Sequence, residues 1–219
     1  MQLLKKIFAV TLQPVIAKRI YRTSYYKWED ITLRIPAGVF HPKYFFSTKY
    51  LLQHVLQLPL ENKKVFELGA GNGLLSIACA KRNAIVTSSD ISKRVIDALQ
   101  ENAQTNQVKI STVESDLFDV IPKQHFDIIA INPPYYPKDA KNELEKAWYC
   151  GENFEYFEKL FFQLGEYVNA TSKILMVLSE DCNLERIFSI AARNHFNFTQ
   201  IHTRKFYWER NYIFEIKRQ

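Results

Sequence analysis

Asn132, Pro133, Pro134 and Tyr135 follow an apolar run at residues 126–131, and their side chains are suited to holding a flat amino group. Consecutive prolines cannot continue a strand ladder, so they predict a rigid loop where that strand ends. The side-chain oxygen of Asn132 is a hydrogen-bond acceptor, and a residue that precedes a proline is held extended. The ring of Tyr135 offers a flat face. These residues predict a site that orients a planar NH2 group and aims its nitrogen lone pair at an electrophile.

A glycine-rich turn lies upstream, with Gly69, Gly71 and Gly73 between an apolar strand and a helix. Such a turn lets the backbone approach a ligand, and the helix N-terminus supplies free N–H groups. The third glycine follows the second by two residues, which departs from the dinucleotide fingerprint. Glu67 precedes the first glycine, where a pyrophosphate-binding loop would gain nothing from a carboxylate. A cationic cofactor with an amino acid tail therefore fits this turn better than NAD does.

Acidic residues end the next two predicted strands. Asp90 lies about twenty residues after the turn, where a carboxylate can accept hydrogen bonds from ribose hydroxyls. Ser115 and Asp116 follow the third strand, where a carboxylate or a backbone group could bind an adenine amino group; a plain turn or helix cap explains Asp116 nearly as well. Because the carboxyl ends of parallel strands share one edge of a sheet, we expect Asp90, Asp116 and the Asn132 loop to lie together.

The pattern that positions these residues is an alternation of strands and helices from residue 63 onward. The predicted strands are 64–68, 84–88, 109–114, 126–131 and 173–178, and the predicted helices are 74–81, 92–106, 153–168 and 183–194. Two closing strands, 198–204 and 212–216, are joined by a short connection and predict an antiparallel hairpin. We expect an α/β fold with a doubly wound, mostly parallel, seven-stranded sheet.

The bulk composition excludes several classes of protein. A chain of 219 residues with 47% hydrophobic and 24% charged residues fits one α/β domain and argues against disorder. The three cysteines lack paired spacing and predict free thiols, and no metal-ligand pattern occurs among the five histidines. No apolar run reaches the length of a membrane span, and the N-terminus lacks a signal-peptide cleavage site. We expect a cytoplasmic protein without a bound metal.

The charge is uneven along the chain. The net charge is +6 and the isoelectric point about 9.1, and no acidic residue precedes Glu29. This excess favours an acidic partner such as RNA, or serves solubility alone. The basic stretch predicts a helix to about residue 25, interrupted at Pro14, followed by a strand at 31–35. We expect residues 1–35 to form an extension that docks the substrate, and residues 36–219 to form the main domain, which begins with a helix at 47–56 capped by Ser47.

From about residue 36 onward the chain resembles the class I methyltransferases that use S-adenosylmethionine. The resemblance rests on the glycine turn, on the acidic residues that follow the strands and on the Asn-Pro-Pro-Tyr sequence at 132–135. It implies that a Rossmann-like fold binds the cofactor through Glu67, Gly69, Gly71, Gly73, Asp90 and Asp116. It implies that Asn132 and Pro133 accept the two N–H hydrogens of the acceptor while Tyr135 covers one face. Pro134, Tyr136 and Trp148 are the expected substrate contacts.

Within that class, Asn-Pro-Pro-Tyr marks enzymes that methylate planar nitrogens, namely adenine N6, cytosine N4, guanine N2 or the glutamine side-chain amide. Residues 147–153 and the Phe40-His-Pro42 segment are similar to short forms of the release-factor glutamine methyltransferases, although Cys150 stands where that family usually has a second glycine. Residues 132–136 are also similar to adenine-N6 tRNA methyltransferases. The resemblance therefore favours a glutamine in a protein, with an activating subunit left open. An amino group of a nucleobase in RNA or DNA is the alternative, and a non-catalytic binding protein of the same fold is a remote one.

Overall fold

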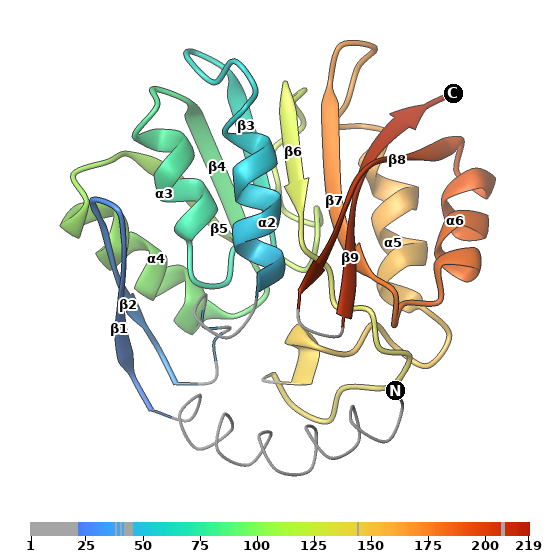
Figure 1. Cartoon of the computed structure of the whole chain (residues 1–219), viewed down its shortest axis with the longest axis horizontal. Helices are drawn as coiled ribbons and strands as arrows, with labels where there is room; N and C mark the ends of the chain where they lie inside the picture. Colours follow the sequence, from blue (N-terminus) through green and yellow to red (C-terminus); the bar gives the residue numbers. More distant parts are fainter. Residues whose placement is uncertain (1–21, 38, 40, 42–45, 144, 207–208) are drawn as a thin grey trace.

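The computed structural model describes residues 22–37, 39, 41, 46–143, 145–206 and 209–219 (Figure 1). Its strands are β1 (Ser24–Trp28), β2 (Ile31–Ile35), β3 (Lys64–Leu68), β4 (Ile85–Asp90), β5 (Ile110–Glu114), β6 (Ile128–Ile131), β7 (Lys173–Ser179), β8 (Phe196–Phe206) and β9 (Glu209–Arg218). Its helices are α2 (Phe46–Val55), α3 (Leu74–Ala80), α4 (Lys93–Thr105), α5 (Glu155–Leu164) and α6 (Leu184–Arg193), with a short 3-10 helix, η1, at Glu145–Ala147.

Seven strands form one sheet in the order β5-β4-β3-β6-β7-β9-β8. The first five of these strands are parallel, and β9 is antiparallel to both β7 and β8. This confirms the predicted doubly wound sheet with a closing hairpin. Strands β6 and β7 are almost continuously apolar, as expected where helices cover both faces of a parallel sheet.

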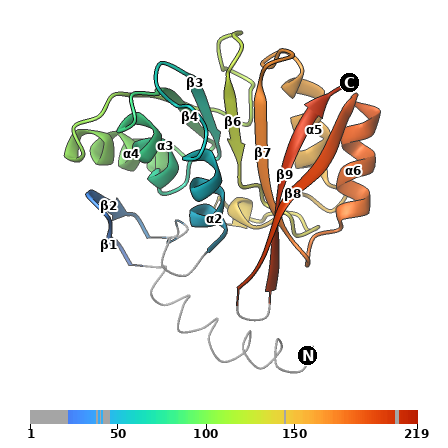
Figure 2. The same ribbon diagram turned by 45° about the horizontal axis from the view of Figure 1, so that its top comes forward.

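Helices cover the sheet on both faces and enclose two apolar clusters (Figure 2). One cluster joins α2, α3 and β2 to the sheet, with Leu51, Leu74 and Val65 among its fully buried side chains. The other joins α5, α6 and the segment 117–126 to the opposite face, and it includes Phe66 and Phe161. The sheet is therefore fixed from both sides, and its carboxyl edge is a rigid base for the loops that leave it.

The hairpin of β1 and β2 stands apart from the main sheet and packs on α4 (Figure 1). Two buried asparagines one helical turn apart on α4, Asn102 and Asn106, bind the backbone of β2 through their side-chain amides. Asn102 accepts from the N–H of Arg34 at 2.7 Å and donates to its carbonyl at 2.9 Å, and Asn106 makes the same pair with Thr32 at 2.9 and 2.7 Å. The asparagines take the place of a neighbouring strand along the edge of β2.

We expect Asn102→Ala to lower the free energy of unfolding by about 1–3 kcal/mol, because it leaves an N–H and a carbonyl of the half-buried Arg34 without partners. Urea denaturation measures this loss. Gln104→Ala, at an exposed position of the same helix, is the matched control. Equal stabilities for the two variants would show that the amide pairs do not hold the hairpin.

Most predicted elements are confirmed to within a few residues, and the differences lie near the N-terminus and after β6. Most of the predicted N-terminal helix lies outside the described residues, and its last residues, Ser24 and Tyr25, belong instead to β1. Ser47 was expected to cap its helix but lies within the first turn of α2. The short helix η1 was not predicted. The proposed boundary at residue 36 stays a prediction, although Ile31, Leu33 and Ile35 are buried in the same cluster as α2 and α3.

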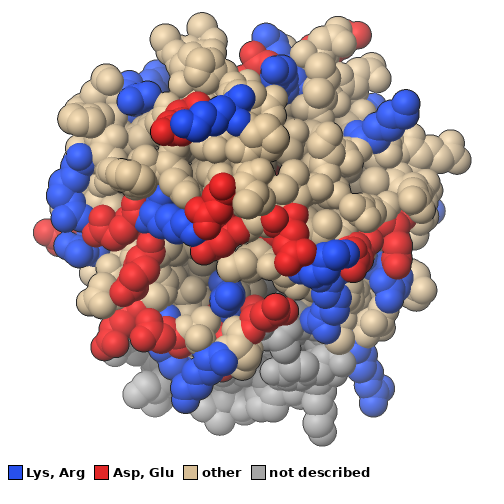
Figure 3. Space-filling view, turned by 180° about the vertical axis from the view of Figure 1, so that it is seen from behind, with Lys and Arg blue, Asp and Glu red and all other residues tan. Residues whose placement is uncertain are grey.

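The face seen from behind carries acidic and basic side chains side by side (Figure 3). Lys159 of α5 pairs with both Asp116 and Asp119 at 2.7 Å, and Glu158 pairs with Arg193 at 2.6 Å. Basic and acidic side chains are interspersed over the described part of this face. The excess of +6 does not gather there into one basic surface.

Candidate active site

The candidate site lies at the carboxyl edge of the sheet, where β3 ends. From β3 the chain forms β4 and β5 on one side and then returns to form β6 on the other side of β3. The last residues of β3 and β6 are paired, Leu68 with Ile131, so Gly69 and Asn132 leave adjacent strands at the same level. Asp90 ends β4 on the other side of β3. Open α/β sheets bind ligands outside such a switch point. The register therefore brings together the residues that the sequence predicted to share one edge.

The glycines of this turn have two different structural roles. At Gly69, with φ +71°, an added Cβ would meet nothing within 4 Å, so open space lies beside the backbone. At Gly73, with φ +76°, a Cβ would clash with Cδ1 of Leu99 on α4. Gly69 thus leaves room for a ligand, whereas Gly73 allows α3 to pack closely on α4. The side chain of Asn72 accepts from the N–H of Leu74, the first residue of α3, at 2.9 Å.

Glu67 is buried beneath this turn. Its carboxylate accepts from the N–H of Ser76 at 2.9 Å and from the hydroxyl of Ser76, which also contacts the hydroxyl of Ser88. Burial raises the pKa of Glu67 to about 8, against the bonds from Ser76, which lower it. The carboxylate therefore holds α3 to the sheet, and positive charge at the turn would favour its ionised form.

Asp90 is bonded to the turn and to the start of α4. Its two oxygens accept from the N–H of Gly71 at 3.1 Å and the N–H of Ser92 at 3.0 Å. Burial raises the pKa of Asp90, and these bonds counteract it. Because a carboxylate can accept about four hydrogen bonds, both oxygens retain lone pairs for a ligand.

Asp116 lies next along the edge and is exposed. Its carboxylate pairs with Lys159 of α5 at 2.7 Å, and its backbone carbonyl accepts from the N–H of Asp119 at 3.3 Å. Tyr156, near the start of α5, lies close enough to Asp90 and Asp116 for their charges to raise the pKa of its phenol, although burial is the larger cause. Sequence reasoning missed Tyr156 because nothing in its spacing links it to the strands.

Asn132 is held by the helix on the opposite side of the site. Its side-chain NH2 donates to the hydroxyl of Ser47 and to the hydroxyl of Thr48, both at 3.2 Å. Ser47 and Thr48 lie in the first turn of α2. The two neighbouring hydroxyl residues, Ser47 and Thr48, are visible in the sequence, but Ser47 was expected only to cap its helix. The segment 42–45, which includes part of the predicted Phe40-His-Pro42 motif, lies outside the described residues.

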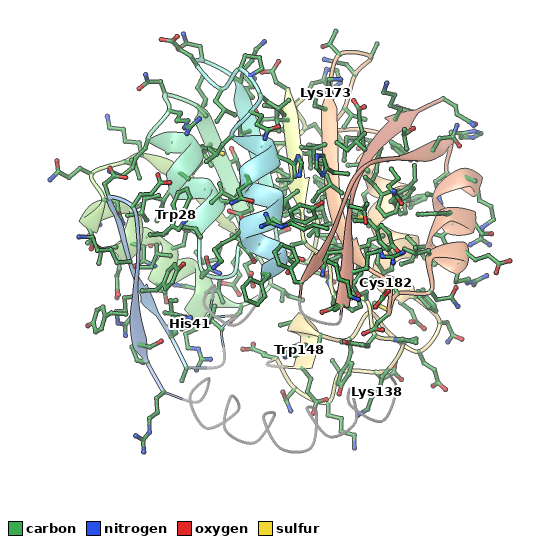
Figure 4. All side chains as sticks on the ribbon, in the orientation of Figure 1. Trp28, His41, Lys138, Trp148, Lys173 and Cys182 are labelled. Carbon is green, nitrogen blue, oxygen red and sulfur yellow. The ribbon has the colours of Figure 1, made fainter. Side chains whose placement is uncertain are left out.

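The loop after Asn132 is tied to the segment at 147–151. The N–H of Tyr136 donates to the carbonyl of Trp148 at 3.1 Å, and the carbonyl of Tyr136 accepts from the N–H of Cys150 at 3.0 Å. Lys138 lies over the ring of Tyr149, 4.6 Å from its centroid. Figure 4 shows Trp148 and Lys138 on the side of the sheet opposite Lys173, at the carboxyl edge. The predicted substrate contacts Tyr136 and Trp148 therefore belong to one paired loop.

Tyr135 is largely enclosed. Burial is the main cause that raises the pKa of its phenol, and a hydrogen bond with Ser179 at the end of β7 acts in the opposite sense. Its ring centroid lies 4.8 Å from that of Tyr136. Tyr135 therefore stays a neutral flat surface beside Asn132 at any physiological pH. Pro133 is buried and Pro134 half-buried, which agrees with a rigid loop.

Helix α2 is packed against the closing hairpin through a partly buried cluster of rings. His54 and His202 have ring centroids 4.5 Å apart, and the hydroxyl of Tyr50 lies 3.4 Å from Nδ1 of His202. Burial lowers the pKa of His54, and His202 lowers it further. Arg204 adds a positive charge near Tyr50. A proton on His54 would therefore work against the packing of α2 on β8.

We expect the contribution of neutral His54 to stability to be lost as the pH drops below the ordinary histidine pKa of about 6.5. At a pH between that value and the lowered pKa of His54, the unfolded chain binds a proton on His54 that the native protein does not bind. The contribution of neutral His54 to stability is therefore complete above about pH 6.5 and is lost as the pH falls through the lowered pKa. Melting temperatures between about pH 8 and 5.5 measure it. His54→Gln should gain stability relative to the wild type as the pH falls over this range, whereas His125→Gln, at an exposed position, should keep the wild-type dependence on pH; equal slopes for both would contradict the assignment.

The residues present fit S-adenosylmethionine. The turn has open space at Gly69, the carboxylate of Asp90 has lone pairs to spare for hydroxyl groups, and a cation at the turn would favour the ionised form of Glu67 beneath it. In the part of the chain that the structure describes, no group of three or more His, Cys, Asp or Glu side chains could hold a metal ion. All three cysteines are buried free thiols. No described helix is both long enough and apolar enough to cross a membrane.

Residues 30–148 match the family model of the methyltransferase small domain, which is more than half of the chain. A chain named as a protein N5-glutamine methyltransferase of Methanocaldococcus jannaschii is 37% identical over 118 residues, which cover 53% of this chain and 57% of that one. A release factor glutamine methyltransferase of Lactococcus lactis is 32% identical over 130 residues, 58% of this chain and 47% of that one. The chain spans about half the length of these relatives.

Among solved structures, the Mtq2–Trm112 complex of E. cuniculi, responsible for methylation of the termination factor eRF1, has a TM-score of 0.64 at 19% identity, covering 83% of this chain and 99% of that one. Other neighbours contain bound S-adenosylmethionine. The fold and the edge of the sheet described above are those of S-adenosylmethionine-dependent methyltransferases. The chain belongs to the methyltransferase small domain family.

Proposed function

We propose that this protein transfers a methyl group from S-adenosylmethionine to the side-chain amide nitrogen of a glutamine in a protein of the release-factor type. The observation that carries the proposal is the fixed amide of Asn132 at the switch point of the sheet, next to the open glycine turn. Curated relatives at 37% and 32% identity are named for glutamine methylation. The N-terminal extension would add contacts to the substrate.

The chain would hold the cofactor at the carboxyl ends of β3, β4 and β5. Asp90 would accept hydrogen bonds from the ribose hydroxyls, and Asp116 or its neighbouring backbone would bind the adenine amino group. Gly69, Gly71 and Gly73 would bring the backbone close to the amino acid tail, with Glu67 beneath them. S-adenosylmethionine supplies a methyl group on a sulfonium, which is already activated for transfer.

The acceptor nitrogen is a poor nucleophile because its lone pair is delocalised into the amide. The oxygen of Asn132 and the carbonyl of Pro133 would accept the two N–H hydrogens, which orients the nitrogen and stabilises positive charge as it develops. Tyr135 would cover one face of the planar group, and Pro134, Tyr136 and Trp148 would contact the rest of the substrate. Alignment supplies most of the acceleration, so no separate strong base is required before attack.

A nucleobase amino group is the second candidate, and cations placed over aromatic rings favour it. Besides Lys138 over Tyr149, Arg204 lies 4.9 Å from the ring centroid of Phe206, at the tip of the closing hairpin. Cations and flat rings together suit RNA. One neighbour of similar fold is a guanine-N2 methyltransferase of 16S rRNA with bound guanosine. The glutamine acceptor is preferred because several of the relatives that match in sequence, including those at 37% and 32% identity, are named for it.

The test is to incubate the purified chain with S-adenosylmethionine carrying a labelled methyl group and, in separate reactions, a bacterial release factor and total RNA. Label on a glutamine of the release factor is expected. Label on adenine or guanine, with none on protein, would replace the proposed acceptor with a nucleobase. Because the Mtq2–Trm112 structure is a complex, each reaction is repeated with cell extract to supply an activating subunit.

A further inference from the structure

Asn132 is held through its side-chain NH2 group, which is not expected to touch the substrate. A side-chain amide has two N–H donors and one oxygen acceptor. Both donors are directed to α2, one to Ser47 and one to Thr48, each at 3.2 Å. The oxygen is then the only polar group of Asn132 left to accept from an incoming NH2 group.

The two hydroxyls come from a helix that cannot easily move. Thr48 is buried, and Phe46 next to it is stacked on Phe206 of β8 with ring centroids 5.2 Å apart and planes 10° apart. One turn further along α2, Tyr50 packs edge-on against the same ring at 5.5 Å. Helix α2 also packs on β7, the strand beside β6. The anchor of Asn132 is therefore part of the rigid core and not of a loose loop.

A side-chain amide can present either its oxygen or its NH2 to the site, because the two ends have the same shape. An NH2 group aimed at the acceptor would meet the donors of that acceptor and could not accept from them. The choice of amide orientation therefore decides whether Asn132 can bind the acceptor in the reactive geometry.

We propose that Ser47 and Thr48 are positioning residues that hold the side chain of Asn132 in place by accepting from its NH2 group, which leaves its oxygen for the acceptor nitrogen. The inference rests on the proposed function for the role of that oxygen. The hydrogen bonds themselves are independent of any acceptor, so they can be tested first in the protein alone.

The first measurement is nuclear magnetic resonance of the side-chain NH2 groups in the full chain. The resonances of Asn132 are assigned by their disappearance in Asn132→Ala. In the double variant Ser47→Ala with Thr48→Val, these resonances should shift, and their hydrogens should exchange with water about 5–100-fold faster, as the loss of two hydrogen bonds predicts. Unchanged resonances in a folded double variant would overturn the proposal, whether or not an acceptor is known.

The second measurement is methyl transfer to a bacterial release factor, with cofactor affinity determined separately by calorimetry. Each single replacement should lower kcat about 3–10-fold and the pair about 10–100-fold, with cofactor affinity unchanged. Thr48→Ser keeps the hydroxyl and loses only a methyl group, so it should keep the wild-type kcat. Loss of kcat in Thr48→Ser equal to that in Thr48→Val would show that packing at this position, and not the hydroxyl, is what matters. If even the wild-type protein does not methylate the release factor, the proposed acceptor is wrong, and the resonance measurement still decides the role of Ser47 and Thr48.

Discussion

Asn132→Ala is expected to lower methyl transfer by more than about 100-fold while cofactor affinity stays almost unchanged. The side chain should touch the acceptor amine and not the cofactor, so its loss removes orientation and charge stabilisation together, on the order of 3 kcal/mol or more in the transition state. The variant also takes away the partner of the Ser47 and Thr48 hydroxyls, so its melting temperature is measured beside its activity. Single-turnover transfer of a labelled methyl group measures the effect.

A matched control for Asn132→Ala is Asn62→Ala, since Asn62 is exposed and lies at the far end of β3. Its turnover should equal that of the wild type. If Asn132→Ala instead lost cofactor binding or melted at a much lower temperature, the loop at 132–135 would have a structural role, and the assignment of its amide to the acceptor would be wrong.

The sheet and the common edge of the site could be predicted from sequence because they depend on local patterns. Apolar runs of strand length alternate with helical spacing from residue 63 onward, and parallel strands place their carboxyl ends together. Strand β3 was predicted with its observed bounds, and Gly69, Asp90 and Asn132 leave neighbouring strands as expected. The position at which each of these strands ends is determined by residues close to it in the chain.

The contacts that fix individual side chains could not be predicted, because they join residues far apart in the chain. Asn132 meets Ser47 across 85 positions, and Asn102 meets Arg34 across 68. Glu67 was expected to face the cofactor, yet its carboxylate is bonded to Ser76 beneath the turn. A carboxylate before a glycine turn looks the same in sequence whether it points outward or into the core. Only the packing of α3 on the sheet distinguishes the two.

Asp90→Ala is expected to weaken binding of S-adenosylmethionine about 10–100-fold, because charged hydrogen-bond partners contribute about 1.5–3 kcal/mol each. The variant removes the proposed acceptor of the ribose hydroxyls. It also releases the N–H groups of Gly71 and Ser92, which hold the turn in the shape that a ligand meets. Both losses act on the same equilibrium. Calorimetric titration with S-adenosylmethionine and with its demethylated product measures the effect without any acceptor.

Two control variants separate the loss of charge at Asp90 from the loss of its side chain and from the loss of any carboxylate nearby. Asp90→Asn keeps one oxygen acceptor and the size of the side chain, so its affinity should fall between those of the wild type and Asp90→Ala. Asp97→Ala removes an exposed carboxylate on α4 that pairs with Lys93 and should leave affinity unchanged. If Asp90→Ala bound the cofactor as well as the wild type does, the ribose would be held elsewhere. If NAD bound more tightly than S-adenosylmethionine, the assignment of the glycine turn to a cationic cofactor would fail as well.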